Sequence, residues 1–328
     1  MKKNYFISGG TGSFAKKFAE LIIKKGEAKK IIIFSRDEYK QMMMKELSFV
    51  KKNLKIFRFY IGDVRDKNRL QWAINNDIDV VIHSAALKQV PTTEYNPFET
   101  VQTNIIGTQN IIEVCINKKI DKTILVSTDK AVSPLNLYGS TKLTAEKLFI
   151  SANLFKGKSK SKFSVVRYGN VMGSRGSVIP ILLRQNRQNK NFTVTDKHMT
   201  RFNITLDQAV KFVNNCIQKM KGQEIFIPKC SSYRILDLTS AINKNRKINF
   251  IGIRKGEKIH EELVNSSEFN YSEENKNSFI LYPLKSIKIK KNKKVNNLSS
   301  YNSLNNKTFL KLDEIKKLIL KNTSDFEK

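Results

Sequence analysis

A glycine-rich turn close to the N-terminus constrains the fold of this chain more than any other segment. Residues 4–8 form an apolar run typical of a buried strand, and the sequence GGTGSFA follows at residues 9–15. Phe18, Leu21 and Ile22 then fall on one face of a predicted helix. In such a strand, turn and helix, small residues let the backbone approach a pyrophosphate at the helix N-terminus, and Ala15 is tolerated at the third small position. We therefore expect a dinucleotide to contact Gly9, Thr11, Gly12, Ser13 and Phe14.

Strands and helices alternate along the chain after this turn. Apolar segments predict further strands at residues 30–34, 55–60, 80–83, 123–126 and 162–167. The alternation predicts an α/β fold, a Rossmann-type doubly wound parallel sheet with a smaller C-terminal α/β substrate-binding domain. We assign residues 1–171 and 204–228 to the first domain, and 172–203 and 229–328 to the second. Later elements are predicted as helices at 181–187, 207–220 and 312–320, a strand at 224–227, a turn-rich crossover at 173–180 and a surface loop at 285–294.

The ends of the second and third predicted strands carry side chains suited to an adenosine ribose. Ser35 and Arg36 favour NADP, since an arginine there can hold a 2′-phosphate, whereas Asp37 leaves NAD open. Asp63 is placed either to contact the adenine or to cap the following helix. Lys40 and Val64 complete the contacts that we predict at this end of the cofactor.

Small residues follow the fourth predicted strand. Ala85 and Ala86 allow a cofactor to lie close, and Lys88 comes directly after them. Asn104, on a helical stretch, is predicted to brace the active-site strand beside the cofactor, with a plain surface asparagine as the alternative. We count all four among the cofactor contacts.

Residues 127–142, with the sequence STDKAVSPLNLYGSTK, gather four titratable side chains after the strand at 123–126. Tyr138 and Lys142 are four apart and share a helical face, so a lysine ammonium and an oxidised nicotinamide ring could both lower the pKa of the phenol. A usable base near pH 7 needs a depression of roughly three units, about 4 kcal/mol. Asp129 and Lys130 lie at the strand end, free for separate acid and base chemistry.

The charge balance allows two interpretations. The chain has 60 Lys and Arg against 29 Asp and Glu, a net charge of +31. Such an excess could indicate binding to nucleic acid or to anionic lipid, but the lysines are spread along the chain with abundant Asn and Ile, which is typical of a compositional bias. We expect neither a nucleic-acid nor a membrane partner. Three unpatterned cysteines and three histidines without zinc spacing favour a cytosolic protein without a metal.

The chain contains an ordered series of short motifs, which are SGGTGSF, GDVRD, AALK, STDKA, NLYGSTK, VRYGNV, SRGSVIP, MTRF and GEKIHE. The series resembles the extended short-chain dehydrogenase/reductases over about residues 3–284. More narrowly, it resembles the soluble UDP-N-acetylglucosamine 4,6-dehydratases that invert C5 and open pseudaminic acid biosynthesis. Tyr138 stands where membrane-bound, C5-retaining relatives are expected to carry Met, and Lys130 stands where dTDP-glucose dehydratases are expected to carry Glu.

The resemblance implies a role for each motif residue. Tyr138, supported by Lys142, takes the C4 hydroxyl proton as hydride passes to NADP. Lys130 removes the C5 proton as a neutral amine, which needs a lowered pKa, and Asp129 protonates the departing C6 hydroxyl. The implied substrate is UDP-N-acetylglucosamine. The implied assembly is a homo-oligomer of up to six subunits (a hexamer). The implied substrate contacts are Lys88, Thr128, Asn170, Arg201, Arg254 and Glu257. For each basic residue among them, the alternative is a surface charge without a ligand.

Two other functions remain open at this point. A nucleotide-sugar epimerase or a C5-retaining dehydratase could use the same scaffold, which the pair Asp129 and Lys130 disfavours. A protein that kept the fold but lost catalysis is disfavoured by intact Tyr138 and Lys142. Departures from the family pattern at Ala15, Asn203 and Lys255 leave the four catalytic positions untouched.

Overall fold

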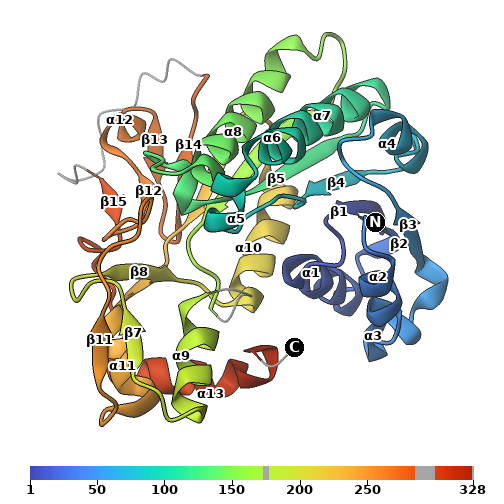
Figure 1. Cartoon of the computed structure of the whole chain (residues 1–328). Coiled ribbons are helices and arrows are strands. Elements are labelled where there is room, and N and C mark those ends of the chain that lie inside the picture. The colour runs from blue at the N-terminus through green and yellow to red at the C-terminus, as the bar shows by residue number, and fades with distance from the viewer. Residues whose placement is uncertain (173–176, 285–299, 327–328) are drawn as a thin grey trace.

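A nine-stranded sheet forms the centre of the computed structural model, which describes residues 1–172, 177–284 and 300–326 (Figure 1). Its strand order is β13-β14-β9-β6-β5-β4-β1-β2-β3. All neighbours from β9 to β3 pair in parallel, while β13 and β14 are antiparallel. The strands are β1 (Lys3–Ser8), β2 (Ala28–Ser35), β3 (Phe57–Ile61), β4 (Val80–His83), β5 (Lys122–Thr128), β6 (Lys162–Tyr168), β9 (Ile225–Pro228), β13 (Ser272–Glu274) and β14 (Ser278–Leu281).

Helices cover both faces of this sheet (Figure 1). On one face α1 (Ser13–Lys24) packs against α10 (Leu206–Lys219), with α2 (Glu38–Lys45) and α3 (Ser48–Lys51) nearby. The other face carries α4 (Lys67–Ala73), α5 (Val90–Tyr95), α6 (Pro97–Val101), a π-helical turn (Gln102–Ile106), α7 (Gly107–Asn117) and α8 (Leu137–Phe155). Short 3₁₀ turns lie at Leu54–Ile56 and Asp129–Ala131.

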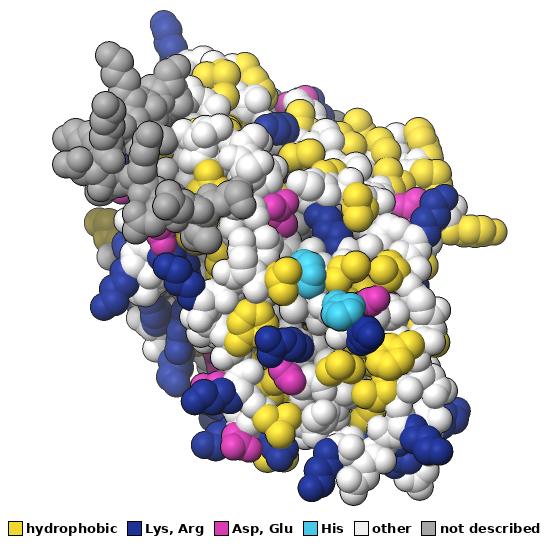
Figure 2. Space-filling model, turned by 90° about the vertical axis from the view of Figure 1, so that its left-hand side faces the viewer, with side chains coloured by type: hydrophobic (Ala, Val, Ile, Leu, Met, Phe, Trp, Pro, Cys, Tyr) yellow, Lys and Arg dark blue, Asp and Glu magenta, His cyan; other side chains and the backbone are white. Residues whose placement is uncertain are grey.

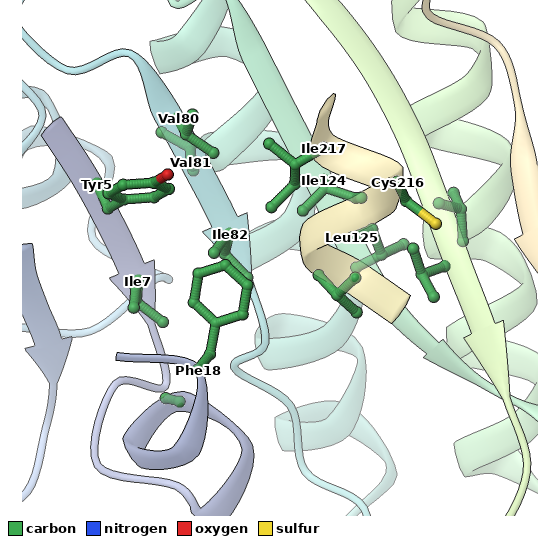
Figure 3. Packing of buried hydrophobic residues seen from close by; sticks show 14 of the residues in the cluster. Tyr5, Ile7, Phe18, Val80, Val81, Ile82, Ile124, Leu125, Cys216 and Ile217 are labelled. Atoms are coloured by element: carbon green, nitrogen blue, oxygen red, sulfur yellow. The ribbon is translucent and has the colours of Figure 1, made fainter. Parts of the chain in front are cut away.

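Burial on both faces explains the apolar strand sequences. Tyr5 and Ile7 of β1 and Ile82 of β4 are at most 2% exposed and pack with Phe18 of α1, while Ile217 of α10 covers β5 (Figure 3). A parallel sheet covered by helices needs such continuous apolar strands. The chain leaves β1 toward β2 on one side and later returns to β4 on the other, which makes the carboxyl ends of β1 and β4 the switch point where α/β proteins bind ligands.

A second, smaller core lies beside the sheet and is built from the later part of the chain. It contains Phe192, Met199, Leu238 and Ile315, all at most 2% exposed. The elements around it are α9 (Val178–Arg187), β7 (Phe192–Val194), β8 (Thr200–Asn203), β10 (Ser231–Arg234), α11 (Ile235–Asn243), β11 (Ile248–Phe250) and α13 (Leu312–Phe326). The apolar residues of β12 (Glu262–Val264), α12 (Ser266–Phe269) and β15 (Tyr301–Asn302) pack against the core of the large sheet instead. Three two-stranded sheets, β10-β8, β11-β7 and β12-β15, connect them.

The structure corrects two boundaries. Residues 272–281 extend the large sheet through β14, which pairs with β9. The domain assignment from the sequence instead places all of 229–328 in the second domain. Helix α9 begins at Val178, so Pro180 lies in its first turn, where its missing N–H has no helical partner to lose. The predicted surface loop at 285–294 and residues 173–176 of the predicted crossover lie outside the described residues. The division into two domains otherwise stays a prediction.

Candidate active site

The glycine turn after β1 has the geometry of a phosphate cradle. Gly9 has a φ of +66°, and a Cβ there would lie 2.9 Å from the Cα atom of Ala85. Gly12 caps α1 without any side-chain bond to the first helical turn, so the N–H groups of that turn remain available to a ligand. Phe14 stacks on Phe18 with a ring separation of 5.9 Å, which fixes the helix start. These residues fit the pyrophosphate of a dinucleotide.

Of the residues at the end of β2, Asp37 is bonded within α2, whereas the Arg36 side chain is exposed. The Asp37 carboxylate accepts the Lys40 backbone N–H at 2.9 Å as the cap of α2, and it also pairs with the Lys40 ammonium. Hydrogen bonds from Lys40 hold the pKa of Asp37 below its usual range. Ser35 lies at the strand end, where its hydroxyl accepts a bond from Gln41. Arg36 is exposed, with its guanidinium 3.6 Å from the carboxylate of Asp63.

One of the two roles predicted for Asp63 is wrong. Asp66, not Asp63, caps α4, because its carboxylate accepts the Arg69 backbone N–H at 2.9 Å. Asp63 instead accepts bonds from the backbone and the side chain of Arg65 at 2.9 and 2.8 Å. Burial opposes the charge of Asp63, but Arg65 outweighs it and lowers the pKa of the carboxyl. The adenine contact stays a prediction, as does that of Val64, which is buried after β3.

Asn104 is 1% exposed, which excludes the surface alternative. Its side-chain oxygen accepts the Leu87 N–H at 2.8 Å, and its amide nitrogen donates to the Leu87 carbonyl at 2.9 Å and to the Thr141 hydroxyl at 3.0 Å. It therefore braces the loop after β4, with Ala85, Ala86 and Lys88, against α8 and not against strand β5. Its amide hydrogens are committed to these two partners, so we assign it positioning and not direct cofactor contact.

Tyr138 and Lys142 lie one turn apart at the start of α8. Asn136 caps this helix by accepting the Gly139 N–H at 2.8 Å, and Pro134 precedes it. The Lys142 ammonium donates to the Val126 carbonyl of β5 at 2.9 Å, and burial lowers its pKa to about 8. The helix cap and the bond to β5 thus hold both side chains at the carboxyl edge of the sheet.

The phenol of Tyr138 does not behave as the sequence predicted. Burial raises its pKa to about 12, against the opposing effects of the Lys130 charge and a hydrogen bond with the Thr128 hydroxyl. Lys142 is directed to the backbone of β5 and does not supply the expected depression. The protein groups alone therefore leave Tyr138 a weak acid.

Asp129 and Lys130 form a buried cluster with a third residue, Glu261. The Lys130 ammonium lies 3.1 Å from Asp129 Oδ1 and 3.1 Å from Glu261 Oε1. Thr128 donates its hydroxyl to Asp129 Oδ1 at 2.9 Å. Asp129 is 1% and Glu261 3% exposed, yet Asp129 Oδ2 and Glu261 Oε2 have no hydrogen-bond partner among the described residues. Buried carboxylate oxygens of this kind are rare and point to a polar group that arrives with a ligand.

The pKa of Lys130 is shifted opposite to our expectation. Burial alone would lower it, but the charges of Asp129 and Glu261 outweigh burial and raise the pKa above its usual range. Burial and the neighbouring Glu261 raise the pKa of Asp129, which suits a proton donor. The pKa of Glu261 is lowered, because Lys130 and Arg201 outweigh its burial.

The predicted substrate residues lie around this cluster. Arg201 on β8 is 8% exposed, and its guanidinium donates to the carbonyls of Thr200 and Ile259 at 2.8 and 2.9 Å. Glu257 lies 3.6 Å from the same guanidinium, so its carboxylate orients Arg201. Arg254 is exposed, and its backbone N–H lies 3.4 Å from the Glu257 carboxylate. Asn170, after β6, has a buried side-chain oxygen with no partner among the described residues.

Sequence reasoning missed Glu261. It is the last residue of the motif GEKIHE, in which we predicted a substrate contact at Glu257 but no role for Glu261. Glu261 is 131 positions from Lys130, and no local pattern predicted that β12 would bring them together. Its only signal was membership of that motif.

The chain has the fold of the short-chain dehydrogenase/reductases, with a glycine turn, a Tyr-x-x-x-Lys helix and a cluster of Asp129, Lys130 and Glu261 at one sheet edge. The sequence matches the model of the polysaccharide biosynthesis protein family over residues 5–283, and the chain belongs to that family.

Three known proteins illustrate the likeness. A UDP-N-acetylglucosamine 4,6-dehydratase (inverting) of Campylobacter jejuni is 45% identical, covering 93% of each chain. A UDP-glucose 4-epimerase of Rickettsia bellii is 41% identical over 97% of this chain and 95% of the relative. The crystal structure of Pen from Bacillus thuringiensis has a TM-score of 0.88 and 40% identity, covering 98% of both chains.

Three further observations complete the description. Lys and Arg side chains are spread over much of the face in Figure 2, among uncharged and apolar side chains. Within residues 1–172, 177–284 and 300–326, no helix is long and apolar enough to cross a membrane. The same ranges hold no cluster of His, Cys, Asp and Glu suited to a metal ion.

Proposed function

We propose that this protein is a UDP-N-acetylglucosamine 4,6-dehydratase that inverts C5, producing UDP-2-acetamido-2,6-dideoxy-β-L-arabino-hex-4-ulose for pseudaminic acid biosynthesis. The observation that carries the proposal is the buried contact of 3.1 Å between Asp129 and Lys130 beside Tyr138. An acid and a base at one sheet edge can remove two groups from adjacent carbons. The inverting dehydratase of Campylobacter jejuni, 45% identical, supports the same assignment.

The residues divide the proton transfers among them. Tyr138 takes the C4 hydroxyl proton, and the resulting ketone acidifies the C5 hydrogen. Lys130 removes that hydrogen as a proton, and Asp129 protonates the C6 hydroxyl, which leaves as water. Thr128 bonds the sugar near C4. Asn170, Lys88, Arg201 and Arg254 hold the sugar and diphosphate, with Glu257 orienting Arg201.

A nicotinamide dinucleotide, when bound, supplies a transient hydride acceptor and a positive ring charge. The glycine cradle at Gly9 and the open helix start at Gly12 fit its pyrophosphate. We propose NADP over NAD, because Asp37 is committed to capping α2 while Arg36 remains exposed at the ribose position. Arg36→Ala should weaken NADP binding about tenfold, measured by quenching of protein fluorescence, with little change for NAD. Equal losses for both would contradict this preference.

The pair Asp129 and Lys130 favours dehydration over C4 epimerisation. An epimerase returns hydride to the carbon that lost it, so its chemistry requires neither an acid at C6 nor a base at C5. C4 epimerisation is the second candidate function, because one relative is named UDP-glucose 4-epimerase.

Incubation with UDP-N-acetylglucosamine in deuterated water, followed by NMR, tests the proposal. We expect a 6-deoxy-4-keto sugar with deuterium at C5 and inverted configuration, and no product from Tyr138→Phe. A retained C5 would assign the other dehydratase branch. A C4 epimer without water loss would assign the epimerase.

We also propose a cytosolic homo-oligomer. The three cysteines, Cys115, Cys216 and Cys230, are buried free thiols, as expected in a reducing compartment. Light scattering of the purified protein measures the number of subunits, and a monomer would contradict the proposal.

A further inference from the structure

Glu261 is built into the acid–base cluster and not into the surface. It directly precedes β12, and its backbone N–H donates to the Ser303 hydroxyl at 3.0 Å. One carboxylate oxygen, Oε1, lies 3.1 Å from the Lys130 ammonium and 3.8 Å from Arg201 Nε. The other, Oε2, is buried without a partner among the described residues. This carboxylate therefore has unused hydrogen-bonding capacity next to a protonated amine.

Lys130 must lose a proton before it can remove one from C5. Two acceptors lie within hydrogen-bond distance of Lys130 Nζ, and they are Asp129 Oδ1 and Glu261 Oε1. Asp129 must keep its own proton until the C6 oxygen departs, so it is not available. Lys130 itself is only a quarter exposed, and a bound sugar would cover it further. Glu261 is the acceptor that remains.

We infer that Glu261 accepts the proton of Lys130 and thereby converts Lys130 into the base of the dehydration. This inference rests on the proposed function. Glu261 acts through Lys130 and does not touch the substrate, so it is a positioning and proton-accepting residue. Among the protein groups alone, the charges of Lys130 and Glu261 stabilise each other, which raises the pKa of Lys130 and lowers that of Glu261. A sugar that covers Lys130 lowers the local dielectric and shifts the pair toward two neutral groups.

The proton count closes through each step. The ammonium proton moves to Glu261 Oε1, which leaves a neutral amine beside a carboxylic acid. The amine then takes the C5 proton and becomes an ammonium again. The proton of Asp129 leaves with the C6 oxygen as water, and Asp129 becomes a carboxylate beside the ammonium. Both electrons of the broken C5–H bond form the C5–C6 double bond, and those of the C6–O bond leave with oxygen.

Other titratable groups face this cluster from every side and remain in any variant of Glu261. They are Asp129 from the 3₁₀ turn, Tyr138 from α8, Arg201 from β8, Tyr233 from β10 and Lys258 from the loop before β12.

Glu261→Gln tests the inference, because glutamine keeps the shape but cannot accept the proton. Two rates are compared in single turnovers between pH 6 and 10, C4 oxidation by the absorbance of reduced nicotinamide and water loss by NMR. C4 oxidation should persist, since it uses Tyr138. Water loss at pH 7 should fall about a hundredfold or more. It should then rise about tenfold per pH unit, because Lys130 must now release its proton to solvent.

Two further variants separate proton acceptance from structure. Glu261→Asp keeps a carboxylate and should restore most of the water loss with the pH profile of the wild type. Glu262→Gln removes the adjacent, half-buried carboxylate, whose partner is the Ser133 hydroxyl at 3.1 Å, and should leave both rates unchanged.

Several outcomes would overturn the inference. Water loss in Glu261→Gln that equals or exceeds the wild-type rate at pH 7 would make Glu261 a mere counter-ion that restrains Lys130. A parallel loss of C4 oxidation, or a deficit without pH dependence, would assign a purely architectural role. In each case a wild-type protein that dehydrates the sugar keeps the proposed function intact. A wild type that oxidises C4 without losing water would overturn both.

Discussion

Two buried clusters in this protein have the same composition, one cation between two carboxylates, and differ in how completely their atoms are bonded. Lys130 lies between Asp129 and Glu261 at the substrate edge of the sheet. Arg167 of β6 lies between Glu146 of α8 and Glu268 of α12.

The arginine cluster is saturated. Arg167 is fully buried and donates five hydrogen bonds, two to Glu146, two to Glu268 and one to the Leu263 carbonyl, at 2.6 to 3.1 Å. The two carboxylates outweigh burial and raise the pKa of Arg167 further above its usual range. A guanidinium does not lose its proton in proteins, so this charge is permanent. The cluster joins α8, which carries Tyr138, to the segment that follows Glu261.

The lysine cluster is left incomplete. Each carboxylate bonds Lys130 through one oxygen and leaves the other without a partner among the described residues, at a typical cost of about 1–3 kcal/mol per buried group. A lysine can exchange its proton where an arginine cannot. If the proposed function is right, the comparison teaches that this fold uses arginine where a buried charge must stay and lysine where a proton must move.

The largest effect should come from making the two cations alike. Lys130→Arg keeps the positive charge but removes the ability to become a neutral base, so we expect water loss to fall about a thousandfold or more. NADP binding and C4 oxidation should remain. NMR of the sugar product gives the dehydration rate, and the absorbance of reduced nicotinamide gives the oxidation. Activity within tenfold of the wild type would break the distinction between the clusters.

Glu268→Gln removes one carboxylate from the saturated cluster and should act on stability. The variant leaves part of the Arg167 charge unpaired in the interior, and we expect a loss of about 3–5 kcal/mol in the free energy of unfolding. Urea denaturation at pH 7 measures it. Glu274→Gln, which removes a half-exposed partner of Lys229, is the matched control with a change below about 1 kcal/mol. Equal changes in the free energy of unfolding of both variants would show that the buried cluster contributes no more to stability than an exposed ion pair.

The sheet and the saturated cluster differ in how far sequence could predict them. Strand β4 was predicted at its observed bounds, and β1 and β6 within one residue, because buried parallel strands must be continuously apolar. Most of the predicted site residues before Tyr138 follow from the same strands, since they lie at a strand end or shortly after it. Lys40 and Asn104, on helical segments, are the exceptions. Local patterns therefore sufficed for the edge at which the cofactor and substrate residues meet.

Contacts between distant segments were out of reach. Glu261 meets Lys130 and Glu268 meets Arg167 across separations of 131 and 101 residues, and neither glutamate had a local pattern that indicated burial. Without Glu261, the pKa of Lys130 was expected to fall and not to rise. The joining of β14 to β9 was missed for the same reason.

Lys142 lies one turn from Glu146 of the arginine cluster, and its titration should appear in the stability of the protein. Burial lowers its pKa in the folded state to about 8 from 10.5, so between these values the unfolded chain binds more protons than the folded one. Stability contributed by this group must therefore rise with pH from about 8 to 10.5, by up to about 3 kcal/mol. Comparing urea denaturation of wild type and Lys142→Met at pH 7 and pH 10 isolates the effect. A difference between the two proteins that does not change with pH would contradict the lowered pKa.

The smallest effect on stability should come from Asp129→Asn, and its sign distinguishes the clusters most sharply. The pKa of Asp129 is raised in the folded protein. At pH values just above the ordinary pKa of an aspartate, the folded protein therefore still holds a proton that the unfolded chain has released. The ionised carboxylate is thus a burden to folding at neutral pH, and its removal should stabilise the protein by about 1 kcal/mol while water loss stops. Glu146→Gln, the corresponding change at Arg167, should destabilise it. Denaturation of both variants at pH 7 measures the two signs, and a destabilised Asp129→Asn would show that the lysine cluster, like the arginine cluster, serves the fold first.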